Sequence, residues 1–106
     1  MYTIWKYSIG PSKEAQIYSL PAGAEILSFG IDAQNNLCFW ARVNTAAMLE
    51  HHKLACVGTG WALDNMLNER SNKYILFIGT AQYDSGMWHL FDLGAADESE
   101  VLEYSI

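Results

Sequence analysis

Apolar and polar residues alternate with a period of two along most of the chain, which is typical of β-strands and not of helices. Residues 2–9 (YTIWKYSI) show the pattern, with one face carrying Tyr2, Ile4, Lys6 and Ser8 and the other Thr3, Trp5, Tyr7 and Ile9. Residues 37–44 (LCFWARVN) repeat it, with one face carrying Leu37, Phe39, Ala41 and Val43 and the other Cys38, Trp40, Arg42 and Asn44. Both segments are therefore predicted to be strands with one buried face.

The same reasoning predicts seven strands in all, at residues 2–9, 15–20, 24–33, 37–44, 51–58, 74–82 and 87–93. The third has a mixed pattern that indicates burial on both faces or a bulge near Gly30. Turn-forming residues separate the strands, notably QNN at 34–36 and DSG at 84–86. Residues 45–50 are compatible with one turn of helix, and residues 61–72 look irregular or weakly helical. We expect an all-β fold, or a β-rich one with one short helix: an antiparallel meander of about six to seven strands in a curled sheet or small sandwich.

The length of 106 residues corresponds to one small domain. We place the β domain at residues 1–93 and an acidic C-terminal tail at 94–106, either a solvated extension or a weak helix near 98–104. Five of the twelve acidic residues and none of the six basic ones lie in 92–106, so the rest of the chain is nearly neutral. Six scattered Lys and Arg residues do not form the basic face that DNA or RNA binding requires.

Composition also indicates where such a chain resides. With 51% hydrophobic and 17% charged residues it is expected to fold, and no apolar run reaches the about 18 residues of a membrane span. The start, MYTIWKYSIG, lacks the pattern of a signal peptide. We therefore expect a cytoplasmic protein without a membrane contact, in which Cys38 and Cys56 are reduced and buried.

No cofactor or metal site is expected. His51, His52, Cys56 and His89 are the candidate ligands, but His51 and His52 would point to opposite faces of a strand. His89 fits better as a hydrogen-bonded histidine of a half-buried strand. No serine or cysteine lies in a nucleophile elbow, and the aspartates sit at turns and strand ends, so the chain is expected to bind and not to catalyse.

Fourteen aromatic residues are many for a domain of this size. Phe29, Phe39, Phe77 and Phe91 fit the core. Trp61 follows the loop Gly58-Thr59-Gly60, where a tryptophan can stack on a ligand, contact another subunit or pack in the core, and these three options stay open.

Two further features suit a phosphorylated aromatic ligand, and each has an ordinary structural alternative. The loop 58–60 offers backbone N–H groups and a hydroxyl to a phosphate, or is simply a turn. Lys6 lies between Trp5 and Tyr7 in the sequence. These three residues could bracket a nucleotide, or Lys6 could simply be a lysine on the surface of an amphipathic strand.

Six blocks, in this order and spacing, carry a resemblance to a family: IWKYSI (4–9), LPAGAEILSF (20–29), LCFWARVN (37–44), VGTGW (57–61), YILFIGTAQ (74–82) and MWHLF (87–91). Over residues 2–92 they resemble a family of small phage and bacterial proteins known as a domain of unknown function. The pattern also resembles the phage anti-CBASS sponges, which sequester cyclic dinucleotide immune signals. The chain departs from the family in having Trp61 where a histidine usually follows Gly-Thr-Gly, and its acidic tail has no counterpart.

The resemblance implies a homo-oligomeric β protein that binds a cyclic dinucleotide without cleaving it. In such a site Tyr7 and Trp61 would stack on bases, Lys6, Arg42 and the loop 58–60 would meet phosphates, and Thr59 and Thr80 would bond base edges. The alternative from another class is a phage accessory domain that docks on a host protein through its exposed aromatic side chains and its acidic tail. A third is a small hydrolase of a nucleotide signal, with His51 or His89 beside the phosphates.

Overall fold

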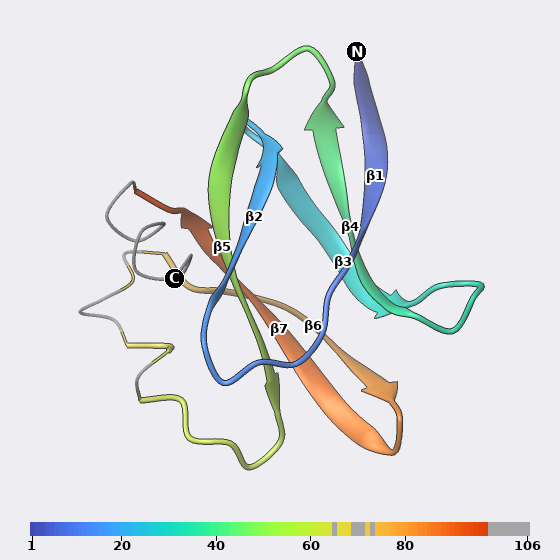
Figure 1. The fold of residues 1–106 in the computed structure, drawn as a ribbon, viewed down its shortest axis with the longest axis vertical. Helices are drawn as coiled ribbons and strands as arrows, with labels where there is room; N and C mark the ends of the chain where they lie inside the picture. The colour runs from blue at the N-terminus through green and yellow to red at the C-terminus, as the bar shows by residue number, and fades with distance from the viewer. Residues whose placement is uncertain (65, 69–71, 73, 98–106) are drawn as a thin grey trace.

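The computed structural model describes residues 1–64, 66–68, 72 and 74–97. In these residues seven antiparallel strands form two sheets of one domain, without a helix (Figure 1). The strands are β1 (Tyr2–Ser8), β2 (Gln16–Pro21), β3 (Glu25–Ile31), β4 (Leu37–Asn44), β5 (Leu49–Gly58), β6 (Leu76–Tyr83) and β7 (Gly86–Ala95). The predicted all-β fold and the number of strands are confirmed. Within these ranges no helix is long and apolar enough to cross a membrane.

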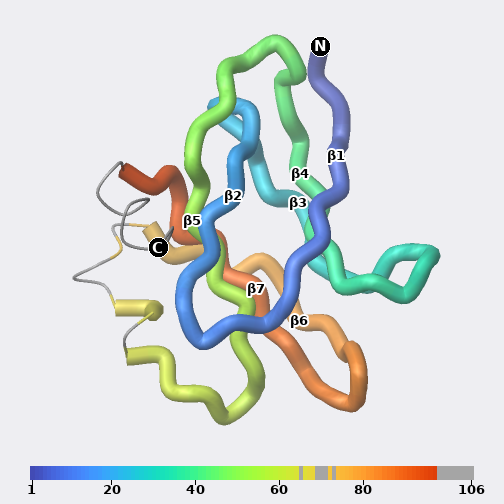
Figure 2. Tube along the Cα trace, viewed as in Figure 1, coloured from blue at the N-terminus to red at the C-terminus, as the bar shows by residue number. Residues whose placement is uncertain are grey.

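The strand order is β1-β4-β3 in one sheet and β2-β5-β7-β6 in the other. Only β3–β4 and β6–β7 are hairpins between chain neighbours. The connections β1–β2, β2–β3 and β4–β5 pass from one sheet to the other, and β5–β6 stays within the four-stranded sheet, where β7 lies between the two strands (Figure 2). The arrangement is therefore a small sandwich, one of the two forms expected, with crossovers where a plain meander would have hairpins.

Turn chemistry accounts for both hairpins. Asn35 has φ 64°, a conformation that asparagine tolerates better than most residues. Asp84 and Ser85 have φ 49° and 64°, and two consecutive positive φ values are those of the type I′ turn that matches the twist of paired strands. The turns at QNN and DSG therefore lie where the sequence predicts them.

The main core lies between the two sheets and confirms the predicted faces of β4. Leu37, Phe39, Ala41 and Val43 are almost fully buried, and they pack with Leu20, Leu54, Cys56 and Leu90 from the other sheet. Tyr7 of β1 stacks on Phe39 with ring centres 5.1 Å apart. Burying each large apolar side chain contributes about 1.5–3 kcal/mol, so this face supplies much of the driving force for folding.

A second, smaller core covers the opposite face of the four-stranded sheet. It joins Ala55, Val57 and Leu93 of the sheet to Met66 and the half-buried Trp61, Leu63 and Leu67. The β5–β6 connection thus folds back over the sheet and brings Trp61 with it. The outer face of the three-stranded sheet is open by comparison, with Tyr2 65% and Ile4 58% exposed.

Three sequence predictions need correction in the main body of the fold. The predicted turn of helix at residues 45–50 is not formed. The chain makes a tight turn after Asn44, whose side chain accepts a hydrogen bond from the Ala46 N–H at 3.1 Å, and β5 starts at Leu49. The bulge of β3 lies between Ile26 and Ser28, before Gly30. Phe77 is 54% exposed, because a bulge in edge strand β6 turns it outward against Phe91 and away from the sandwich.

The last strand extends two residues beyond the predicted end at Leu93. β7 runs to Ala95, and the Ala96 N–H donates to the His51 carbonyl at 2.8 Å. The segment 61–72 is irregular where it is described. The Leu67 N–H donates to the Leu63 carbonyl at 2.8 Å, and the Asn72 N–H donates to the Asn68 carbonyl at 2.9 Å. The predicted extension or helix at 98–104 lies outside the described residues.

Candidate functional site

Three of the sequence blocks meet at His89. Thr59 follows β5, Thr80 lies on β6, and His89 lies opposite Thr80 in the β6–β7 ladder. The Thr59 Oγ1 is 2.7 Å from His89 Nε2, and the Thr80 Oγ1 is 2.8 Å from His89 Nδ1. Because a neutral imidazole has one donor and one acceptor nitrogen, one hydroxyl must donate and the other accept. His89 is thus a fully hydrogen-bonded histidine on a half-buried strand, as its sequence context indicates.

Gly58 lets two tryptophans approach the end of β5. A Cβ atom at this position would lie 2.8 Å from Trp61 Nε1 and 2.8 Å from Trp88 Cζ3, closer than side chains allow. The two indole rings meet edge to face with centres 5.7 Å apart. The glycine is therefore required by packing, and this packing fixes the orientation of Trp61.

The loop 58–60 has the hydrogen bonds of a turn. The Thr59 N–H donates to the Met87 carbonyl at 3.3 Å, and the Trp61 N–H donates to the Gly58 carbonyl at 3.2 Å. Gly60 has φ 87°, which favours glycine. These bonds are those of a turn, and they engage the Thr59 N–H, one of the donors expected to meet a phosphate.

A pocket of about 420 Å³ opens beside this loop. Its lining consists of Lys13, Gly60, Trp61, Ala62 and Met66. The Lys13 Nζ lies 5.8 Å from the centre of the Trp61 ring, within cation–π range. The pocket thus combines an aromatic surface with one positive charge, and its volume falls in the range of small-molecule sites.

Of the eight predicted site residues, Gly60 and Trp61 line this pocket. Gly58 and Thr59 precede them in the same loop, and Thr80 is joined to Thr59 through His89. Lys6, Tyr7 and Arg42 lie on the three-stranded sheet instead, and each is engaged there.

Lys6 forms a 2.9 Å ion pair with Asp32, which holds the pKa of the Asp32 carboxyl at about 2, assisted by the Asn36 N–H. The side chain points to the face of β1 opposite to Trp5 and Tyr7, so the expected aromatic bracket around it is not formed.

Tyr7 and Arg42 are also committed to structure. Tyr7 stacks on Phe39 in the core, and burial raises the pKa of its hydroxyl. The Arg42 guanidinium lies 4.6 Å from the centre of the Tyr2 ring on the outer face of the sheet. These two residues do not join the group around Trp61.

Lys13 is the residue that sequence reasoning misses. It lies in the β1–β2 loop, 48 positions before Trp61, and nothing in its neighbourhood in the sequence marks it. The loop is held against β5 by the Ser12 N–H, which donates to the Cys56 carbonyl at 3.1 Å. Only this tertiary contact brings Lys13 to the tryptophan.

The other titratable candidates form a separate buried pair. His52 Nε2 is 2.6 Å from Asp92 Oδ1, and His52 Nδ1 has no partner among the described residues. His51 is exposed and points away, as the alternation predicts. Within residues 1–64, 66–68, 72 and 74–97, no three His, Cys, Asp or Glu side chains cluster as metal ligands would. Cys38 and Cys56 are free and buried.

Comparison with known proteins gives one result. No curated protein and no solved structure matches the chain. A family model matches residues 1–101, and so extends further than the sequence blocks at 2–92. The chain therefore belongs to the family described as a domain of unknown function, DUF7352.

Proposed function

We propose that this protein is a phage-encoded binding protein that sequesters a cyclic nucleotide defence signal in the host cytoplasm without cleaving it. The observation that carries the proposal is the pocket beside Trp61, where the Lys13 ammonium and the indole ring lie together. A nucleotide offers the two complementary groups, a flat base and an anionic phosphate.

The expected interaction energies are large enough to bind such a ligand. Stacking one base on an aromatic side chain contributes about 1–3 kcal/mol. The fixed edge-to-face contact with Trp88 holds Trp61 in place before the ligand arrives, which reduces the ordering cost of binding. Lys13 supplies the charge. The exposed Thr59 belongs to the pocket loop, and its hydroxyl, besides its bond to His89, can contact a polar edge of the ligand; Thr80 is bonded to the other nitrogen of His89.

Hydrolysis of the same ligand is a second candidate function, favoured by the contact between Thr59 and His89. A hydroxyl 2.7 Å from an imidazole nitrogen has the geometry of a nucleophile beside a general base. The group that orients the imidazole is the Thr80 hydroxyl, where hydrolases usually have a carboxylate that stabilises the imidazolium. This difference supports binding over cleavage.

We also propose that the protein is a homo-oligomer in which the free edge of β1 pairs with a second copy. The side chains of Tyr2, Ile4 and Trp5 are 65%, 58% and 41% exposed, and the ladder from β1 to β4 has no bulge. Proline, bulges and unpaired charges protect most edge strands, whereas the one charge here, Lys6, is neutralised by Asp32. An antiparallel pair centred on Ile4 would place Tyr2 opposite Lys6 of the second copy, so no like charges face each other.

Light scattering during gel filtration tests this interface. We expect Ile4→Lys to yield a monomer and Met48→Lys, a matched change at a side chain that is 85% exposed in the β4–β5 turn, to leave the oligomer intact. A monomeric wild-type protein would contradict the proposal and would direct attention to docking on a host protein.

The binding proposal is tested by thermal shift against cyclic di- and trinucleotides and cyclic ADP-ribose isomers. At about a hundredfold excess over Kd a ligand stabilises the protein by about 2.7 kcal/mol. Lys13→Ala and Lys6→Ala are a matched pair, since both remove one lysine but only Lys13 lines the pocket. We expect Lys13→Ala and Trp61→Ala to lose the shift and Lys6→Ala to retain it. No shift with any ligand refutes the proposal, and a ligand recovered as cleaved product after heat denaturation supports hydrolysis instead.

A further inference from the structure

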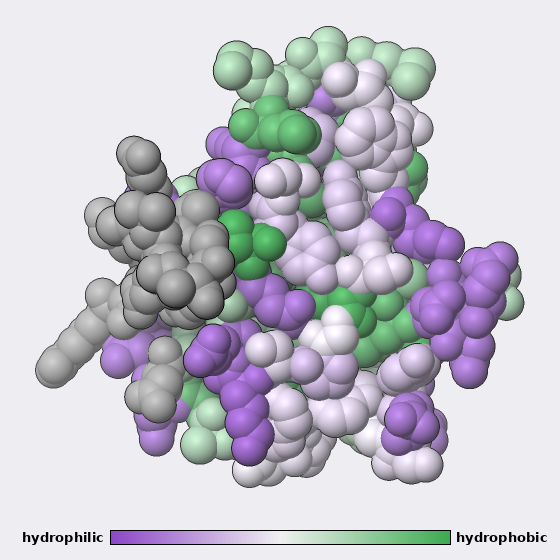
Figure 3. All heavy atoms as spheres, viewed as in Figure 1, coloured by the Kyte–Doolittle hydropathy of each residue, from purple (hydrophilic) through white to green (hydrophobic). Residues whose placement is uncertain are grey.

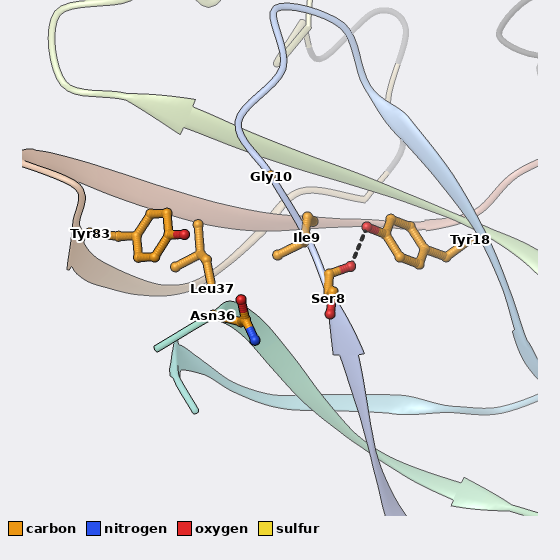
Figure 4. A pocket seen from close by; sticks show the side chains of 7 residues that line it. All are labelled: Ser8, Ile9, Gly10, Tyr18, Asn36, Leu37 and Tyr83. Atoms are coloured by element: carbon orange, nitrogen blue, oxygen red, sulfur yellow. Dashed lines mark hydrogen bonds between the residues drawn. The ribbon is translucent and has the colours of Figure 1, made fainter. Parts of the chain in front are cut away.

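A second pocket opens at the end of the sandwich, where the two sheets separate (Figure 4). The last rung between β1 and β4 is the hydrogen bond from the Ile9 N–H to the Leu37 carbonyl at 3.1 Å, and beyond it the chain crosses to β2. The resulting hollow has a volume of about 300 Å³ and is lined by Ser8, Ile9, Gly10, Tyr18, Asn36, Leu37 and Tyr83. In Figure 3 hydrophobic surface is visible in a depression between the end of β1 and the β6–β7 hairpin.

The pocket has an apolar floor between two tyrosines. Ile9 and Leu37 form the floor and are only 6% and 4% exposed, since they belong to the main core. Tyr18 and Tyr83 stand on either side of them and are half-buried (Figure 4). Such a site suits the faces and edges of a flat ring.

The polar groups of the pocket fall into two kinds. The Tyr18 hydroxyl is committed, since it donates to the Ser8 carbonyl at 2.7 Å, and burial raises its pKa to about 12. The Tyr83 hydroxyl and the Asn36 side-chain amide have no hydrogen-bond partner in the described part of the chain. A hydroxyl and an amide together can both donate and accept, which is what the edge of a nucleobase requires.

Among the described residues, those that line this pocket carry no charged side chain. The nearest acid in the hairpin, Asp32, is bound to the Asn36 N–H and to Lys6, so its charge is already compensated. A phosphate would find neither a cation nor a free cluster of N–H donors here. The chemistry therefore differs from that of the pocket at Trp61, which contains Lys13.

We propose that this pocket is a binding site for an uncharged heterocycle of the size of a nucleobase or nucleoside. The ring lies over Ile9 and Leu37 between the tyrosines, and its polar edge bonds to the Tyr83 hydroxyl and the Asn36 amide. The proposal stands independently of the proposed function, because the ligand needs no phosphate and the site does not include Trp61.

Titration of the ¹⁵N-labelled protein with adenosine, guanosine, cytidine and uridine tests this site. We expect at least one nucleoside to give saturable shift changes at Ile9, Leu37 and Tyr83. Gly10→Leu should abolish them by filling the mouth of the pocket, since a Cβ at Gly10 meets no atom within 4 Å and the fold is preserved. Tyr83→Phe should raise Kd about 2- to 10-fold through the loss of one hydrogen bond, while Tyr2→Phe leaves it unchanged.

The outcomes separate the two sites. If no nucleoside saturates the protein, or if Gly10→Leu and Tyr83→Phe bind as the wild type does, the proposal is wrong. If Trp61→Ala abolishes nucleoside binding and Gly10→Leu does not, the heterocycle binds at Trp61, and this site is refuted while the proposed function survives. Lys13→Ala is expected to leave nucleoside binding unchanged.

Discussion

Replacement of Gly58 by alanine is a direct test of how Trp61 is positioned. The added methyl group would lie 2.8 Å from both Trp61 Nε1 and Trp88 Cζ3, about 1 Å inside ordinary contact distance. Neither indole ring can bend, so at least one ring must move as a whole. Overpacking of this kind costs about 1–3 kcal/mol.

Gly10→Ala is the matched control. A Cβ there meets nothing within 4 Å, and the substitution removes the same backbone freedom from the unfolded chain. That entropic effect stabilises by about 0.4–1 kcal/mol and is common to both variants. The difference between them therefore isolates the clash, and we expect Gly58→Ala to be about 1–3 kcal/mol less stable than Gly10→Ala.

The free energies of unfolding are measured by urea titration, followed by far-UV circular dichroism because tryptophan fluorescence is itself altered. The near-UV spectrum reports whether the coupling of the two indole rings is lost. Equal stability of the two variants, within about 0.5 kcal/mol, would show that Trp61 is not held against Gly58 and would remove the physical basis of the pocket.

Three further predictions concern stability and reactivity. The pKa of Asp32 falls from 3.8 to about 2 on folding, so its contribution to stability is fully present above about pH 4 and is lost as the pH falls through 2. In an acid titration of unfolding, Asp32→Asn should lose this part of the pH dependence. An acid profile identical to that of the wild type would contradict the pairing with Lys6. Burial raises the pKa of the Cys56 thiol to about 12 and also raises that of Cys38, so a thiol reagent such as DTNB should label neither in the native state and both in urea; fast native labelling would contradict their burial. At Asn35, with φ 64°, valine should cost about 1–2 kcal/mol and glycine almost nothing in thermal unfolding, and a neutral valine variant would show that the turn changes conformation.

Local features of the sequence were sufficient to predict the elements. A period of two assigns each side chain of β4 to a face, and the buried set Leu37, Phe39, Ala41 and Val43 follows because only one face of a sandwich sheet can be apolar on average. Turn positions were equally local, since positive φ is tolerated by few residue types, and Asn35 and Ser85 are found at these positions. Trp61 and Gly58 could also be singled out from the sequence as a loop tryptophan and a loop glycine. The sequence did not indicate that Gly58 is required because Trp61 and Trp88 pack against it.

Pairing and proximity were decided only by the tertiary structure. The alternation of apolar and polar residues predicts which side chains of a strand share a face, but not which other strand pairs with it. The pairing of β1 with β4 and the ion pair of Lys6 with Asp32 could therefore not be predicted from the sequence. Lys13 reaches Trp61 because the β1–β2 loop bonds to β5, a contact between segments far apart in the chain. Such contacts depend on the packing of the whole core, in which many weak, nonlocal interactions act together, and no short stretch of residues encodes them.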